Sequence, residues 1–128
     1  MSENENPMHG MTDEEKKEYI INKAMEIIMN SGDARNFAAQ ARDEINNGNY
    51  EKAAELLKEA DKVQTAAQVT QTEMIQGDIR GGDEAMQYSV LFAHAQDTLM
   101  TIQVEINMTK AMLKMAQSFE KRFAKAEN

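Results

Sequence analysis

A histidine and an acid three residues apart are the side chains of this sequence best suited to chemistry. His94 and Asp97 stand within a run, residues 90–100, that is otherwise rich in apolar residues. On a helix, residues three apart share a face, so the imidazole and the carboxylate are expected about one turn from each other. A neutral imidazole can attack phosphorus and carry the group covalently. The alternative is a partly buried core histidine bonded to a neighbour, and spacing alone does not separate the two.

Asp97 also has two interpretations, because it is the one acid in a stripe of apolar residues. As a structural residue, it fixes the register or number of associating helices at some loss of stability. As a binding residue, it meets its own copies in an oligomer. Clustered carboxylates then share protons or take a cation that prefers oxygen ligands, such as Mg²⁺.

Composition excludes most other kinds of site. The chain has no cysteine, and its only other histidine is His9, in a polar N-terminal segment, so a multi-histidine metal site in one chain is not expected. Its 22 acids against 14 basic residues give a net charge of −8, which argues against a nucleic-acid surface. No metalloprotease, nucleophile-elbow or dinucleotide motif is present.

The same sequence predicts a cytoplasmic protein without direct membrane insertion. No apolar run approaches the roughly 20 residues that span a bilayer, and the acidic start is unlike a secretory signal.

The 128 residues suit a single domain after a short tail. We expect residues 1–11 to be disordered and residues 12–128 to form one all-α domain. Its three helices are expected at about 12–46, 50–76 and 83–126. A capping box at Thr12–Glu15 begins the first helix, Asn49 is a candidate cap for the second, and the glycine-rich residues 77–82 read as a turn.

The first two helices each carry one narrow apolar seam at alternating steps of three and four. Asn30-Ser31-Gly32 interrupts the first seam and is a candidate kink. The seam positions are Ile20, Ala24, Ile27, Ser31, Ala34, Ala38, Ala41 and Ile45, then Ala53, Leu56, Ala60, Val63, Ala67, Thr70 and Met74.

The third helix differs because it carries two apolar stripes on nearly opposite sides. One stripe is Met86, Val90, Ala93, Asp97, Met100, Val104, Met108, Ala111 and Met115; the other is Leu91, Ala95, Leu99, Ile102, Ile106 and Leu113. A helix apolar on two sides must be buried on both. We therefore expect an up-down-up three-helix bundle that associates with its own copies around the third helix, as a dimer or a trimer.

The run His94-Ala-Gln-Asp-Thr-Leu-Met100 closely resembles the active helix of the lactose/cellobiose-type enzyme IIA proteins of the bacterial phosphoenolpyruvate-dependent sugar phosphotransferase system. Two other stretches resemble the same family in the right order: Ile28-Met-Asn-Ser-Gly-Asp-Ala-Arg35, and Gln71-Thr-Glu-Met-Ile75 followed by Gly77-Asp78. The resemblance covers about residues 15–118.

The resemblance implies a homotrimeric three-helix bundle in which His94 carries the phosphoryl group. His94 would accept it from the histidine-containing phosphocarrier protein and pass it to a cysteine of the sugar-specific IIB component. Asp97 matches the acid that lines the trimer axis and holds a divalent cation there. The implied sugar is a β-linked disaccharide of the cellobiose/chitobiose or lactose type.

The sequence departs from the family at two positions. Thr98 and Gln68 stand where many members have histidine. The nucleophile is unaffected, but the hydrogen bonding around it is expected to differ.

A competing interpretation is a non-catalytic helical interaction module. Residues 48–60 resemble half of a tetratricopeptide repeat, although no second copy follows at a fixed period. That interpretation leaves His94 and Asp97 without a role.

Overall fold

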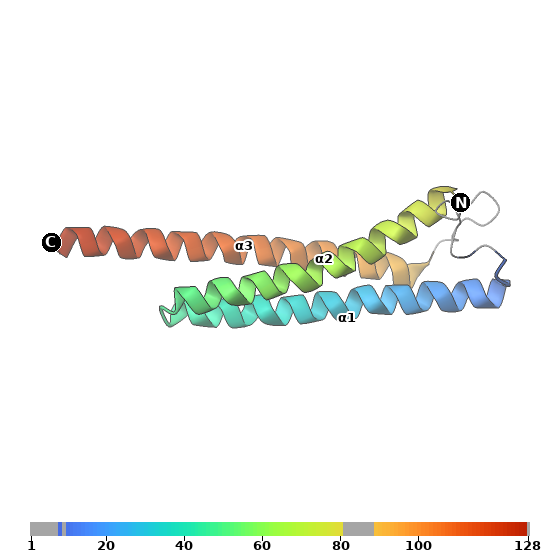
Figure 1. Ribbon diagram of the computed structural model, residues 1–128, viewed down its shortest axis with the longest axis horizontal. Coiled ribbons are helices and arrows are strands. Elements are labelled where there is room, and N and C mark those ends of the chain that lie inside the picture. Colours follow the sequence, from blue (N-terminus) through green and yellow to red (C-terminus); the bar gives the residue numbers. More distant parts are fainter. Residues whose placement is uncertain (1–7, 9, 81–88, 128) are drawn as a thin grey trace.

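Three long helices make up the described part of the chain, in agreement with the predicted all-α class. The computed structural model describes residue 8 and residues 10–80 and 89–127. The helices are α1 (Asp13–Asn46), α2 (Tyr50–Arg80) and α3 (Val90–Glu127). α1 and α2 form an antiparallel pair, and α3 lies beside them and runs in the same direction as α1 (Figure 1). The up-down-up order expected from the sequence is confirmed.

The N-terminus of α1 is fixed by the predicted capping box. The Thr12 hydroxyl accepts from the Glu15 backbone N–H at 3.1 Å, and the Glu15 carboxylate accepts from the Thr12 N–H at 2.9 Å. These two bonds satisfy amides that have no partner inside the helix. α1 then continues without interruption through Asn30-Ser31-Gly32, so the candidate kink does not break the helix.

A tight turn joins α1 to α2. Gly48 adopts a φ of +79°, a conformation that a residue without a Cβ reaches without strain. The Asn49 side chain donates to the Glu44 carboxylate at 2.8 Å, and its backbone N–H donates to the Glu44 carbonyl at 2.8 Å. Asn49 thus precedes α2 as predicted, but its side chain binds the end of α1 instead of capping α2.

The core consists of two apolar clusters separated by a polar layer. One cluster includes Ala34, Ala60 and Ile102, and the other includes Ile27, Ala67 and Leu99. Between them, on α1 and α2, lie the buried side chains of Ser31 and Gln64. We call Ser31 and Gln64 the polar layer. The Gln64 amide donates to the Leu99 carbonyl at 2.8 Å, whereas Ser31 Oγ and Gln64 Oε1 have no partner among the described residues.

The predicted seams are the buried residues, with small differences at their ends. All seam positions of α1 and α2 are buried except Ile45 and Val63, which are half-buried. On α3 the second stripe is buried except for the half-buried Leu91.

The tail and the end of α2 differ from the sequence expectation. Met8 is only 2% exposed and packs with the core, so the expected tail is not disordered at that residue. α2 continues to Arg80, beyond the expected end at 76. The expected start of α3 at 83 lies outside the described residues, as does Met86 of the first stripe.

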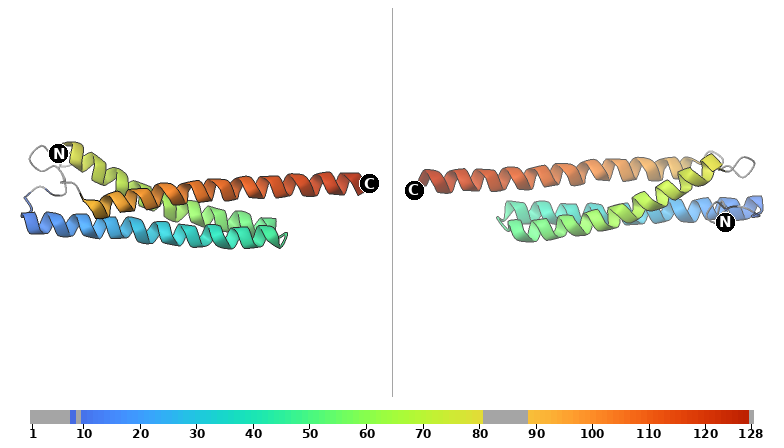
Figure 2. Two further views of the ribbon diagram at one scale, coloured as in Figure 1. Left: turned by 180° about the vertical axis from the view of Figure 1, so that it is seen from behind. Right: turned by 45° about the horizontal axis from the view of Figure 1, so that its top comes forward.

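α3 is longer than the pair that it packs against. Its C-terminal part runs past the α1–α2 turn and ends well beyond it (Figures 1 and 2). Nowhere in residues 10–80 and 89–127 is there a helix of the length and apolarity that crossing a membrane requires.

Candidate functional site

The first turns of α3 hold His94 on the surface of the bundle. The Ser89 hydroxyl accepts from the Phe92 N–H at 3.1 Å, which caps the helix, and the Phe92 side chain is buried beside Met74 and Ile20. Ala95 and Leu99 are buried on the same side of α3. His94 therefore points away from the core and is exposed. An exposed imidazole on a fixed helix is the arrangement that a group carrier needs, and it differs from the buried core histidine of the alternative interpretation.

Thr98 lies one turn after His94 but does not bond its ring. The Thr98 hydroxyl donates to the His94 backbone carbonyl at 2.8 Å. Among the described residues, none forms a hydrogen bond with the imidazole. The described part of the chain therefore leaves both ring nitrogens of His94 open to a reaction partner, and Thr98 bonds the helix backbone instead.

Asp97 is exposed on the adjoining face of α3, within the first apolar stripe. At 100° per residue, His94 lies about 60° around the helix from Asp97, so the histidine stands at the edge of this stripe.

The first stripe of α3 is uncovered in the single chain. Its large members Val90, Met100, Val104, Met108 and Met115 are between 55% and 71% exposed. The opposite stripe is packed on α1 and α2. Of the two sides predicted to be buried, the bundle itself covers one, and the side that carries Asp97 remains open.

Polar contacts that sequence periodicity did not reveal tie α3 to α1. The Arg35 Nε donates to the Glu105 carboxylate at 2.7 Å, and the Arg42 guanidinium donates to the Thr109 hydroxyl at 2.9 Å. Arg42 also lies 3.8 Å from Glu105. These contacts fix how far α3 is shifted along α1. Of the residues that form these contacts, Arg35 alone was singled out from the sequence, as part of one of the stretches that resemble the family.

Gln68, the second departure from the family pattern, takes part in a chain of amides. Its Nε2 donates to Gln103 Oε1 at 2.8 Å, and Gln103 donates in turn to Asn107 Oδ1 at 3.1 Å. Gln68 belongs to α2 and the other two side chains to α3, and among the described residues Gln68 forms no hydrogen bond with His94.

No metal site is complete among the described residues of one chain. Across the described residues, no three histidine, cysteine or carboxylate side chains are grouped closely enough to hold an ion. Asp97 supplies a single carboxylate, so a cation there requires ligands from further copies.

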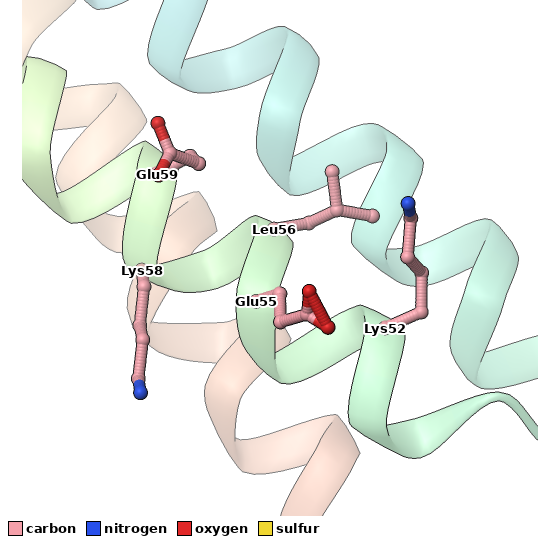
Figure 3. A pocket seen from close by; sticks show the side chains of 5 residues that line it. All are labelled: Lys52, Glu55, Leu56, Lys58 and Glu59. Carbon is pink, nitrogen blue, oxygen red and sulfur yellow. The ribbon is translucent and has the colours of Figure 1, made fainter.

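A hollow on α2 offers no alternative site. Lys52, Glu55, Leu56, Lys58 and Glu59 line it, with Leu56 pointing toward α1 and Lys58 pointing away (Figure 3). Its lysines and glutamates alternate, so it has no cluster of one charge, and it has no histidine.

Known proteins of one family resemble this chain in sequence and in structure. The family model described as "PTS system, Lactose/Cellobiose specific IIA subunit" matches residues 22–117. A lactose-specific EIIA component of the PTS from Lacticaseibacillus casei is 32% identical over 112 residues, which are 88% of this chain and 95% of the relative. An N,N'-diacetylchitobiose-specific EIIA component from Escherichia coli (strain K12) is 33% identical over 90 residues, 70% of this chain and 73% of the relative.

A solved structure agrees with these sequence matches. The crystal structure of the PTS cellobiose specific enzyme IIA from Bacillus anthracis superposes with a TM-score of 0.73 at 32% identity, covering 78% of this chain and 90% of that one. The family model's range, residues 22–117, includes His94, Asp97, the polar layer and the turn between α1 and α2. The chain belongs to the lactose/cellobiose specific IIA family of the sugar phosphotransferase system.

Proposed function

We propose that this protein is a phosphocarrier whose His94 holds the transferred phosphoryl group. The observation that carries the proposal is the exposed imidazole of His94 on the first turns of α3, inside the region that matches the family model. It is the only histidine in that region, which has no cysteine.

The chemistry that we propose is two successive displacements at one phosphorus atom. A ring nitrogen of His94 attacks the phosphorus of a donor phosphohistidine; the new N–P bond forms as the donor N–P bond breaks, and the donor imidazole takes that electron pair. In the second step an acceptor thiolate attacks, and the pair of the His94 N–P bond returns to the His94 ring. Such transfers need in-line positioning and charge stabilisation.

The partners in this proposal are the histidine-containing phosphocarrier protein as donor and a cysteine of the sugar-specific IIB component as acceptor. Each must leave after every cycle, so small transient interfaces around His94 suit the role. The sugar of the system is proposed to be a β-linked disaccharide, since the relatives are named for lactose, chitobiose and cellobiose.

We further propose a homotrimer that buries the first stripe of α3. Five large apolar side chains in a row along one helix face form a surface that a lone bundle leaves in water. Parallel copies around this face would cover it and leave His94 at its edge accessible.

The trimer would bring three Asp97 carboxylates together at its axis. Like charges there repel, and a divalent cation such as Mg²⁺, which prefers carboxylate oxygens, would neutralise them. Asp97 is the residue that would hold the ion, and its contribution is to the assembly.

The test of the carrier role is the intact mass after incubation with phosphoenolpyruvate, enzyme I and the phosphocarrier protein. We expect one added phosphate per chain that is stable at neutral pH and lost in acid. The variant His94→Ala should gain none, whereas the matched control His9→Ala, which removes the chain's other histidine, should be phosphorylated as the parent is. No addition under conditions that phosphorylate a known enzyme IIA would refute the proposal and favour an interaction module.

A further inference from the structure

The C-terminal part of α3 projects beyond the bundle. Leu113 is the last buried residue of α3, and we call residues 114–127 the projection, because none of their side chains is buried. Lys114 and Gln117 at its start still line a hollow with α2, and the residues after them are free of it. At 1.5 Å per residue the projection is about 20 Å long, and it extends past the α1–α2 turn in every view (Figures 1 and 2). The family match ends at residue 117, so most of the projection is additional to it.

The projection has an apolar face with two aromatic rings. Phe119 is 46% exposed and Phe123 is 69% exposed. With the exposed Met112 and Met115 they fall within about 80° of arc on the helix. The described residues leave this face largely in water.

A basic face lies opposite the apolar one. Lys114, Lys121 and Lys125 fall within about 40° of arc, on the far side of the helix from the two phenylalanines. Arg122 lies between the faces, with its guanidinium carbon 5.8 Å from the centre of the Phe119 ring. The projection thus carries four cations against two acids, Glu120 and Glu127, in a chain whose net charge is −8.

Basic residues elsewhere on the bundle are arranged differently. On α2, Lys52 and Lys58 alternate with Glu55 and Glu59 around the hollow of Figure 3, so their charges are compensated locally. The projection is where uncompensated positive charge and exposed aromatic rings occur together.

Further copies of the chain are a poor fit for this surface. Continuing the alternation of three and four beyond Met115 places Ser118, Arg122 and Lys125 on the seam, and like charges would meet there. The rings of Phe119 and Phe123 follow Met115 at steps of four, so each lies about 40° further around the helix and leaves the seam.

We propose that the projection of α3 binds the surface of an anionic lipid membrane. Aromatic side chains on one face and lysine or arginine on the other are the features of helices that lie in a bilayer interface without crossing it. Each basic residue near such a surface adds an attraction that salt screens. The rest of the chain is acidic and would be repelled, so the contact is confined to the end that projects. This binding needs no phosphoryl transfer and is separate from the role of His94.

The test is co-sedimentation of the full chain with vesicles of phosphatidylcholine containing about one-third phosphatidylglycerol, compared with pure phosphatidylcholine. We expect binding to the anionic vesicles at about 0.05 M salt and its loss at about 0.5 M. Two variants probe the two faces: Phe119→Ser with Phe123→Ser, and Lys121→Gln with Arg122→Gln and Lys125→Gln. Each should weaken binding at least about tenfold.

A control matched in charge separates the projection from the net charge of the chain. Replacing Lys52, Lys58 and Lys62 on α2 by glutamine also removes three positive charges, so both triple variants go from −8 to −11. The α2 variant should bind within about twofold of the parent, because its lysines are compensated by nearby acids. Helicity by circular dichroism should be unchanged in all variants.

Absence of binding of the parent to anionic vesicles at low salt would overturn the proposal. The proposal would also be overturned if both projection variants bind anionic vesicles as the parent does, or if the two triple variants lose binding to the same extent. Phosphorylation of His94 is measured separately and has no bearing on these outcomes.

Discussion

Replacing Gln64 by leucine should stabilise this protein, although Gln64 is among its most buried side chains. Gln64 is 1% exposed, its Nε2 donates to the Leu99 carbonyl, and its Oε1 has no partner among the described residues. The Gln64→Leu substitution nearly conserves volume, so the two apolar clusters on either side of the polar layer would meet without a cavity.

The expected magnitude follows from the two amide atoms of Gln64. An unpaired buried acceptor destabilises the folded state by about 1–3 kcal/mol, which leucine removes. The lost hydrogen bond to Leu99 is worth about 0.5–1.5 kcal/mol. The Leu99 carbonyl lies within α3, where a helical backbone N–H is its ordinary partner. The free energy of unfolding should therefore rise by about 1 kcal/mol, which for a chain of this size raises Tm by about 4 °C.

Urea unfolding followed by circular dichroism measures this change, with Gln68→Leu as the matched control one turn along α2. Gln68 is exposed, and its substitution should alter the free energy of unfolding by less than about 0.5 kcal/mol. Ser31→Ala, which removes the other unpaired atom of the polar layer, should stabilise in the same direction as Gln64→Leu. If Gln64→Leu instead lowers the free energy of unfolding by about 1 kcal/mol, the reasoning is refuted, because Oε1 must then accept a hydrogen bond in the folded protein.

Three further predictions concern the assembly and the start of α1. In the presence of a chelator, Asp97→Leu should raise the free energy of unfolding by about 1–4 kcal/mol and keep the oligomer, because apolar side chains replace clustered carboxylates. Added Mg²⁺ should reduce the difference in Tm between this variant and the parent. A fall in the Tm of the variant both with and without chelator would contradict an axial position for Asp97. Val104→Lys should reduce the oligomer to monomers in analytical ultracentrifugation without loss of helicity, since Val104 is 60% exposed in the single chain; an unchanged mass would place the subunit contact elsewhere. Thr12→Ala should lower the free energy of unfolding measured in urea by about 1 kcal/mol, because it removes the hydroxyl that accepts from the Glu15 N–H. An unchanged free energy would show that the first turn of α1 does not unfold together with the rest of the bundle.

The positions of the helices were predictable because each buries a narrow stripe. The alternation of three and four on α1 gave Ile20, Ala24, Ile27 and the positions that follow, and all but the last are buried. The capping box was predictable for a related reason, since it depends only on residues within one turn. The exposure of His94 followed from the register of α3, because its neighbours Ala95 and Leu99 occupy the buried stripe.

Features that depend on contacts between helices were not predictable in the same way. Gln64 is polar and lies one residue beyond a seam position, so no periodic pattern identified it as buried. Met8 lies in a polar segment, yet its side chain is buried in the apolar cluster that includes Ile20 and Phe92. Asn is a common residue type at helix N-caps, but the side-chain amide of Asn49 donates to the Glu44 carboxylate instead of capping α2. In each case a contact outside the period of the apolar seams decided the outcome.

The tight turn around Gly48 has a consequence for the order in which the chain folds. It joins α1 to α2 with very little intervening chain, so this pair can form as a hairpin from local contacts at a small loss of loop entropy. α3 runs parallel to α1 and meets it only after the whole of α2 has been traversed, which makes its docking the slower, non-local step. During synthesis on the ribosome, the alanine-rich seams of α1 and α2 would therefore be paired before the helix that carries His94 has emerged.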